Sequence, residues 1–253
     1  MRRIASPGTF ALLVVIVLVA AGCGGDDNSS ADDQTQTATT AADTQAGVDD
    51  TQAAIDKSQF STKITHPLVP LTPVPYTELK GKEGKTKTRV TNQLLKKTAV
   101  VDGVRVAVLV NKEYEDGELV EHTFDYFAQR SNGSVWYFGE RVQNFENGKV
   151  NHEGQWIAGK GKNKPGLYMP AKPKVGQVFQ QERAPGVAED RSTIVASGIT
   201  RQTGAGTFKN CFHVKDYSPI DKNKEYKYYC AGVGLVHEDE AHAHLDLTSY
   251  KKR

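Results

Sequence analysis

The sequence has few cysteines and none of the common catalytic motifs. Only three of its 253 residues are cysteine, and no two of them form a CxxC pair. It contains no GxSxG nucleophile elbow, no P-loop and no dinucleotide-binding fingerprint. The string HEDEAH at 237–242 has one residue too many between its histidines for a zinc protease. The enzyme classes that these motifs mark are therefore excluded.

The sequence also lacks an apolar run long enough for a membrane-spanning helix. The apolar run Phe10–Ala21 is shorter than the roughly 18 residues that such a helix needs. Arg2 and Arg3 precede this run, and small residues lead from it into Cys23. This order is typical of a cleaved signal peptide, which we place at residues 1–22.

The residues VAAG directly before Cys23 resemble the lipobox of bacterial lipoproteins, in which the cysteine is acylated and becomes the new N-terminus. Ala20 is the one departure, because the strictest pattern has a larger aliphatic residue there. The resemblance implies lipid attachment at Cys23, palmitate included, and a place on the extracytoplasmic face of the cell membrane. The alternative is an uncleaved anchor helix, which also leaves the chain on a membrane.

Composition divides the rest of the chain into three segments. Residues 23–59 are rich in Asp, Thr, Ala, Gln and Ser, which predicts a disordered acidic tether. Four prolines within residues 60–75 predict an extended lead-in that lies along the domain. Residues 76–253 are long enough for one domain with a real core.

Charge is distributed unevenly along the chain. From Lys57 onward there are 30 basic and 22 acidic residues, a net charge of +8. A basic domain of this kind suits anionic lipid head groups or acidic wall polymers. The alternative is an ordinary solvated surface that its lysines keep soluble.

The folded part has the pattern of consecutive β-hairpins. Turn signals lie at 102–103, 116–117, 131–133 and 147–148, each between runs of β-forming residues. We therefore expect a mainly β protein with a single curved antiparallel meander sheet, either a half-barrel or an open barrel. Only two short segments favour helix, NQLLKK at 92–97 and PGVAED at 185–190.

The last of these turns also predicts a register. It places Phe145 opposite Val150 and Phe138 opposite Ile157. The segment 154–177 that follows is rich in Gly, Pro and Lys, which predicts a long ordered loop. Such a loop is either a lid or binding edge, or a structural strap that seals the sheet.

Two cysteines lie in strand-like runs on either side of the loop SPIDKNK. A hairpin centred on this loop pairs residues whose numbers add to 441, so that Cys211 faces Cys230. A directly opposed antiparallel pair has Cα atoms about 4.5 Å apart, which a disulfide tolerates. Because exported proteins meet oxidising conditions, we predict this disulfide, the alternative being two buried free thiols.

The end of the chain holds a candidate metal site. In HEDEAHAHLDL at 237–247, strand alternation places His242, His244 and Asp246 on one face. With His237 nearby, the imidazoles and the carboxylate are donors that zinc or copper accepts. The alternative is a last strand with one wet face.

Aromatic residues are the other candidates for binding. Most of them are expected in the core, but a curved sheet with a large aromatic inner face can leave a cavity. Apolar pockets with a few polar groups are the usual form of small-ligand sites. The candidate ligand-binding residues are Trp136, Phe138, Trp156, Tyr226 and Tyr228.

Two runs resemble segments of bacterial envelope proteins. YYCAGVGLVHE at 228–238 looks like the strand, turn and strand YYxxGVGxV near the C-terminus of several uncharacterised secreted or lipid-anchored β proteins. DYFAQRSNGSVWYFGE at 125–140 is similar to another run of that group. Gly232 and Gly234 in the first run allow positive φ or close backbone approach. The group implies no particular activity. A weaker resemblance is to LolA/LppX-type lipoproteins, in which helices plug a half-barrel that holds lipid.

These observations predict a non-enzymatic binding or structural module of the cell envelope, held at the membrane by an N-terminal lipid anchor. The expected partner is an apolar ligand or an anionic envelope polymer, and not nucleic acid. No cofactor is expected unless the histidine-rich segment binds zinc or copper. The alternative is a metal-dependent or hydrolytic extracytoplasmic enzyme that uses this segment. The sequence does not predict the oligomeric state.

Overall fold

The protein folds into one large antiparallel sheet. The structure is a computed structural model that describes residues 56–240 and 243–253. Within these residues the sheet has 15 strands. Twelve follow the order β10-β11-β12-β13-β14-β15-β2-β3-β4-β5-β6-β7, whereas β1 pairs with β5, and β8 and β9 pair with β6. The end strands do not pair with each other, so the predicted open, mainly β meander is confirmed. In the part of the chain that the structure describes, no helix is long and apolar enough to cross a membrane.

The bounds of the strands follow the chain order. They are β1 (Phe60–Ser61), β2 (Tyr76–Glu83), β3 (Thr86–Val101), β4 (Val104–Glu115), β5 (Glu118–Arg130), β6 (Val135–Glu146), β7 (Lys149–Asn151), β8 (Trp156–Ile157), β9 (Gly166–Met169), β10 (Val178–Gln180), β11 (Arg191–Thr203), β12 (Gly206–Tyr217), β13 (Lys224–Cys230), β14 (Gly234–Glu240) and β15 (Ala243–Lys251). The last strand in the chain, β15, pairs with β2, so that the strands β2–β7 and β10–β15 form one continuous sheet.

The four predicted turns connect consecutive hairpins from β3 to β7. In the turn between β3 and β4, Asp102 has φ 46° and Gly103 has φ 73°. Asn147 and Gly148 repeat this pattern, with φ 51° and 72°. Two consecutive residues with positive φ match the right-handed twist of the flanking strands. These turns therefore keep neighbouring strands directly paired.

Of the two residue pairs predicted beyond the last hairpin, one is confirmed and one is wrong. Phe145 lies opposite Val150, as expected. The prediction for Ile157 is wrong by one residue, because Gly139 and not Phe138 lies opposite it. Gly139 has φ 105°, and a Cβ there would lie 2.3 Å from the Trp156 carbonyl oxygen. Only glycine allows the chain to approach so closely, and this contact shifts the pairing.

Both helix predictions are wrong, since the described residues contain no α-helix and only the short 3-10 turn η1 (Lys57–Gln59). Residues 92–97 belong to β3, which pairs with β2 on one side and β4 on the other. Asn92 and Gln93 pair on both sides, which outweighs the local preference for helix, and the strand is irregular between Leu94 and Thr98. Residues 185–190 form a turn in which Ala184 bridges to Ala188.

The lead-in at 60–75 begins with β1 on β5 and then turns across the sheet instead of running fully extended. The described residues begin at Asp56, and η1 directly precedes the lead-in. Ile64 and Leu68 are buried, and the Thr72 amide donates a 2.9 Å hydrogen bond to the Ile64 carbonyl. The lead-in thus closes one end of the space inside the sheet.

The segment 154–177 favours the structural strap over the lid. Its strands β8 and β9 both pair with β6. Trp156 and Met169 are buried.

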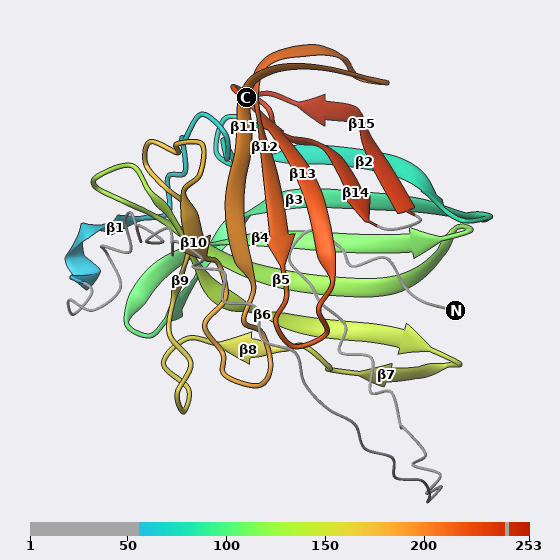
Figure 1. Ribbon diagram of the computed structural model, residues 1–253. Coiled ribbons are helices and arrows are strands. Elements are labelled where there is room, and N and C mark those ends of the chain that lie inside the picture. The colour runs from blue at the N-terminus through green and yellow to red at the C-terminus, as the bar shows by residue number, and fades with distance from the viewer. Residues whose placement is uncertain (1–55, 241–242) are drawn as a thin grey trace, which may run out of the picture.

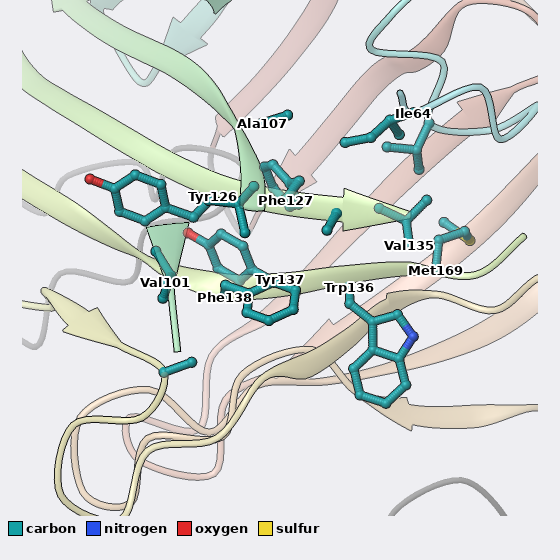
Figure 2. Packing of buried hydrophobic residues seen from close by; sticks show 14 of the residues in the cluster. Ile64, Val101, Ala107, Tyr126, Phe127, Val135, Trp136, Tyr137, Phe138 and Met169 are labelled. Atoms are coloured by element: carbon teal, nitrogen blue, oxygen red, sulfur yellow. The ribbon is translucent and has the colours of Figure 1, made fainter. Parts of the chain in front are cut away.

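The core lies where the two halves of the curved sheet face each other. Figure 1 shows β11, β12 and β13 running across β3 to β6. Phe127 of β5 and Tyr137 of β6 belong to this core (Figure 2). Tyr137 stacks on Phe127 with ring centroids 4.7 Å apart, and the hydroxyls of Tyr168 and Tyr229 lie 3.2 Å apart. The second contact joins β9 to β13, two strands that do not pair with each other.

The predicted disulfide between Cys211 and Cys230 is present, and the two residues are direct partners on β12 and β13. Both are fully buried. We expect the double variant Cys211→Ala/Cys230→Ala to lose about 3 kcal/mol of unfolding free energy, because it frees a loop of this length in the unfolded chain. Urea unfolding measures the loss. Thiols that react in denatured, unreduced wild type would contradict the assignment.

Candidate functional site

Polar and aromatic side chains form two rows across the outer face of the sheet, here called the outer band. Residues that alternate with them, such as Leu245 and Leu247, point inward and are buried. Successive strand partners define the first row: His213, Tyr228, His237, Asp246, Lys80, Arg89 and Tyr114. The second row is Lys215, Tyr226, Asp239, His244, Lys82 and Lys87. Because strands lie about 4.8 Å apart, each row spans on the order of 25 Å.

The end of the outer band on β12 and β13 is aromatic. The His213 ring stacks on Tyr228 at 4.4 Å with a 7° interplanar angle. The Arg201 guanidinium covers the same tyrosine, 4.5 Å from its centroid. Burial and then the Arg201 charge lower the pKa of His213. Tyr226, 5.4 Å from His213, is 37% exposed and leaves ring surface open to solvent.

The middle of the outer band is a histidine held between two carboxylates. His237 Nδ1 lies 2.7 Å from Asp246 Oδ1, and its Nε2 lies 2.6 Å from Asp239 Oδ2. The ring is buried, whereas the Asp239 and Asp246 side chains are 48% and 37% exposed. Both ring nitrogens are therefore occupied by protein oxygens.

The structure places His237, His244 and Asp246 on neighbouring strands, but their side chains do not point to one common position. His244 lies on the same face as Asp246 but is exposed and pairs with Asp239. His242 lies outside the described residues. Within those residues, no three His, Cys, Asp or Glu side chains gather in a metal-like group. Zinc or copper binding stays a prediction, and His237 offers it no free nitrogen.

The end of the outer band on β15, β2 and β3 is basic. Lys82 lies directly opposite Lys87 and beside His244, and all three are exposed. Neither lysine pairs with a carboxylate within the described residues, whereas Lys80 is 2.8 Å from Glu78. These side chains line an open groove of about 630 Å³, which Asp116 borders. We call it the basic groove.

The five predicted ligand-binding aromatics do not share one site. Trp136, Phe138 and Trp156 are at most 2% exposed and belong to the core. Tyr226 and Tyr228 lie on the outer band instead. The predicted apolar pocket is thus filled by the side chains that were expected to line it.

A small apolar cavity remains between the lead-in and the sheet. Leu71, Leu109, Phe127, Tyr168 and Tyr229 are among its lining residues, and its volume is about 60 Å³. Ligand sites typically measure about 300–1,000 Å³. The cavity is too small for a lipid chain.

The inner face of the sheet carries buried acidic residues that sequence reasoning missed. The one buried Lys or Arg among the described residues is Lys227. Its Nζ lies 3.0 Å from Asp216 Oδ2 and 2.7 Å from Glu225 Oε2. The nine buried acidic side chains are Glu113, Glu121, Asp125, Glu140, Glu182, Asp190, Asp216, Glu225 and Glu238.

Burial shifts the pKa values of several of these groups. Burial raises the pKa of Asp125 to about 7, although Tyr137 and Thr123 donate hydrogen bonds to its carboxylate. Burial and the nearby Asp216 raise the pKa of Asp190 to about 8. Burial alone would lower the pKa of Lys227, but Glu225, Asp216 and Glu238 outweigh it and hold that pKa well above its usual value. These raised pKa values favour the protonated forms of Asp125 and Asp190 near neutral pH.

Comparisons with known proteins add little about function. No protein-family model matches the chain, and no curated protein matches it. One solved structure, described as a "putative lipoprotein" from Parabacteroides distasonis ATCC 8503, is similar at a TM-score of 0.37 and 14% identity. The match covers 70% of this chain and 94% of that one. A TM-score this low supports no conclusion about function.

Proposed function

We propose that this protein is a membrane-anchored lipoprotein of the cell envelope, and that it acts as a non-enzymatic module that binds an anionic envelope polymer through the basic groove. The lipobox-like VAAG before Cys23 supports the anchor, although Cys23 lies outside the described residues. Two acyl chains hold a protein stably at a membrane. The acidic segment that follows Cys23 then carries the domain away from the bilayer.

The observation that carries the proposal is the pair Lys82 and Lys87. Like charges directly opposite each other destabilise an antiparallel pair. Here they are exposed, open to a groove, and joined by His244 on the next strand. A ligand with negative groups relieves this repulsion. Of the two partners predicted from the sequence, the anionic polymer is favoured over an apolar ligand, because the inner cavity is only about 60 Å³.

We expect the double variant Lys82→Glu/Lys87→Glu to weaken the binding of carboxylate polymers at least tenfold. The test uses a soluble chain that begins at Gly24, with hyaluronan and polyglutamate as probes in low-salt calorimetry. Binding by wild type should weaken with added salt, since screening reduces attraction between exposed charges.

The matched control is Lys96→Glu/Lys97→Glu, which reverses two exposed lysines of β3 well away from the groove. It changes the net charge by the same amount. Equal weakening by both pairs would show diffuse attraction to the whole domain and would contradict a site at the groove.

A further inference from the structure

We propose that the ligand of the outer band is an anionic polysaccharide, with a sugar ring stacked on Tyr226 and its acidic groups in the basic groove. This inference rests on the proposed function and names the class of polymer. It joins the two ends of the outer band into one site, in which aromatic and basic side chains contact neighbouring parts of one chain.

The first argument is the aromatic end. Tyr226 is the exposed aromatic ring of the outer band, and His213 packs against it at 5.4 Å. Tyr228 beside it stacks on His213 and contacts the Arg201 guanidinium, and these contacts support the aromatic cluster on the outer face. A rigid exposed ring on a sheet offers a face to the C–H groups of a pyranose, which carry partial positive charge.

The second argument is the carboxylates between the two ends. Asp239 and Asp246 are partly exposed and lie between the aromatic residues and the lysines. These carboxylates repel an anionic polymer that has no hydroxyl groups to donate hydrogen bonds. They accept hydrogen bonds from hydroxyls, and charge-assisted bonds of this kind are strong. A ligand rich in hydroxyls fits both the carboxylates and the lysines.

The third argument is the spacing along the second row. Tyr226, Asp239, His244 and Lys82 are successive partners on β13, β14, β15 and β2. At about 4.8 Å for each strand, Tyr226 lies about 14 Å from Lys82. A short oligosaccharide segment can therefore contact the tyrosine and a lysine at once. A lipid head group is too small to do so.

The test compares probes that share carboxylates but differ in sugar rings. Hyaluronan supplies both, polyglutamate supplies carboxylates alone, and phosphatidylglycerol vesicles represent a lipid surface. We expect Tyr226→Ala to weaken hyaluronan binding about three- to tenfold, the range that one stacked ring provides, and to leave polyglutamate binding within about twofold. Tyr226→Phe keeps the ring and should bind hyaluronan like wild type. Thermal melts establish that each variant is folded.

The outcomes separate this inference from the proposed function. Suppose that Lys82→Glu/Lys87→Glu weakens the binding of both polymers, but that Tyr226→Ala weakens the binding of neither or of both equally. The proposal of a polysaccharide ligand is then wrong, whereas the proposal of anionic-polymer binding at the basic groove is supported. If wild type binds neither polymer, both proposals fail. Binding to the vesicles alone would assign the face to lipid and overturn the polysaccharide.

Discussion

Replacing Lys227 with methionine is expected to lower the free energy of unfolding by about 3–5 kcal/mol at pH 7.5, because it leaves buried acidic groups without their cation. Lys227 lies within 3.0 Å of carboxylate oxygens of Asp216 and Glu225, and all three side chains are at most 4% exposed. Neither carboxylate can turn toward water from that position. Urea unfolding of wild type and Lys227→Met measures the effect.

The loss should shrink at pH 5, because burial raises the pKa of Glu225 well above its usual value and protonation of that carboxyl removes its uncompensated charge. The control Lys224→Met changes an exposed lysine on the same strand and should stay within about 0.5 kcal/mol of wild type. Adding Glu225→Gln to Lys227→Met should recover part of the loss, since the two groups form one network. A Lys227→Met protein as stable as Lys224→Met would show that water reaches this cluster.

The hairpins and the disulfide could be predicted because their causes are local. Asp102 and Gly103 adopt positive φ because Asp and Gly tolerate this conformation, which is a property of the two residues themselves. The loop after β12 fixes the partner of Cys211 by counting alone. Residues 92–97 show the opposite case, since their strand depends on neighbours on both sides that are distant in sequence.

The outer band could be predicted only in part. Alternation along 237–247 correctly placed His244 and Asp246 on one face. The lysines that complete the band come from β2 and β3, more than 150 residues earlier in the chain. The pairing of β15 with β2 joins the last and the first long strands of the chain, and no turn signal in the sequence predicts it.

The buried carboxyls could not be predicted from the sequence. Alternation along a strand shows that charged residues share one face, but it does not show whether that face is exposed to solvent or buried. Glu225 and Lys227 alternate with Tyr226 and Tyr228. The sequence predicts Tyr226 and Tyr228 as part of an inner ligand pocket, whereas they lie on the outer band and Glu225 and Lys227 are buried. Only the curvature of the sheet, which encloses one face, decides between these two arrangements.

The same buried carboxyls predict a domain that is more stable in mild acid than in alkali. The pKa of Asp125 rises from 3.8 to about 7 in the folded protein, and that of Asp190 rises from 3.8 to about 8. Above about pH 4 the unfolded chain releases protons that the folded chain keeps, so stability falls as the pH rises. The decline from Asp125 is complete above about pH 7, and that from Asp190 above about pH 8.

Asp125→Asn should remove much of this decline. At about 1.4 kcal/mol for each pKa unit, ionising Asp125 in the folded state costs on the order of 4 kcal/mol. Asparagine stays neutral and still accepts the hydrogen bond from Tyr137. We therefore expect the variant to resemble wild type only near pH 4 and to be more stable by a few kcal/mol at pH 8.5, as measured by urea unfolding across this range. Glu118→Gln, at an exposed carboxyl on the same strand, should leave the wild-type profile unchanged. A wild-type stability that rises from pH 5 to pH 8.5 would show that Asp125 and its neighbours ionise freely, and that the interior of the sheet is open to water.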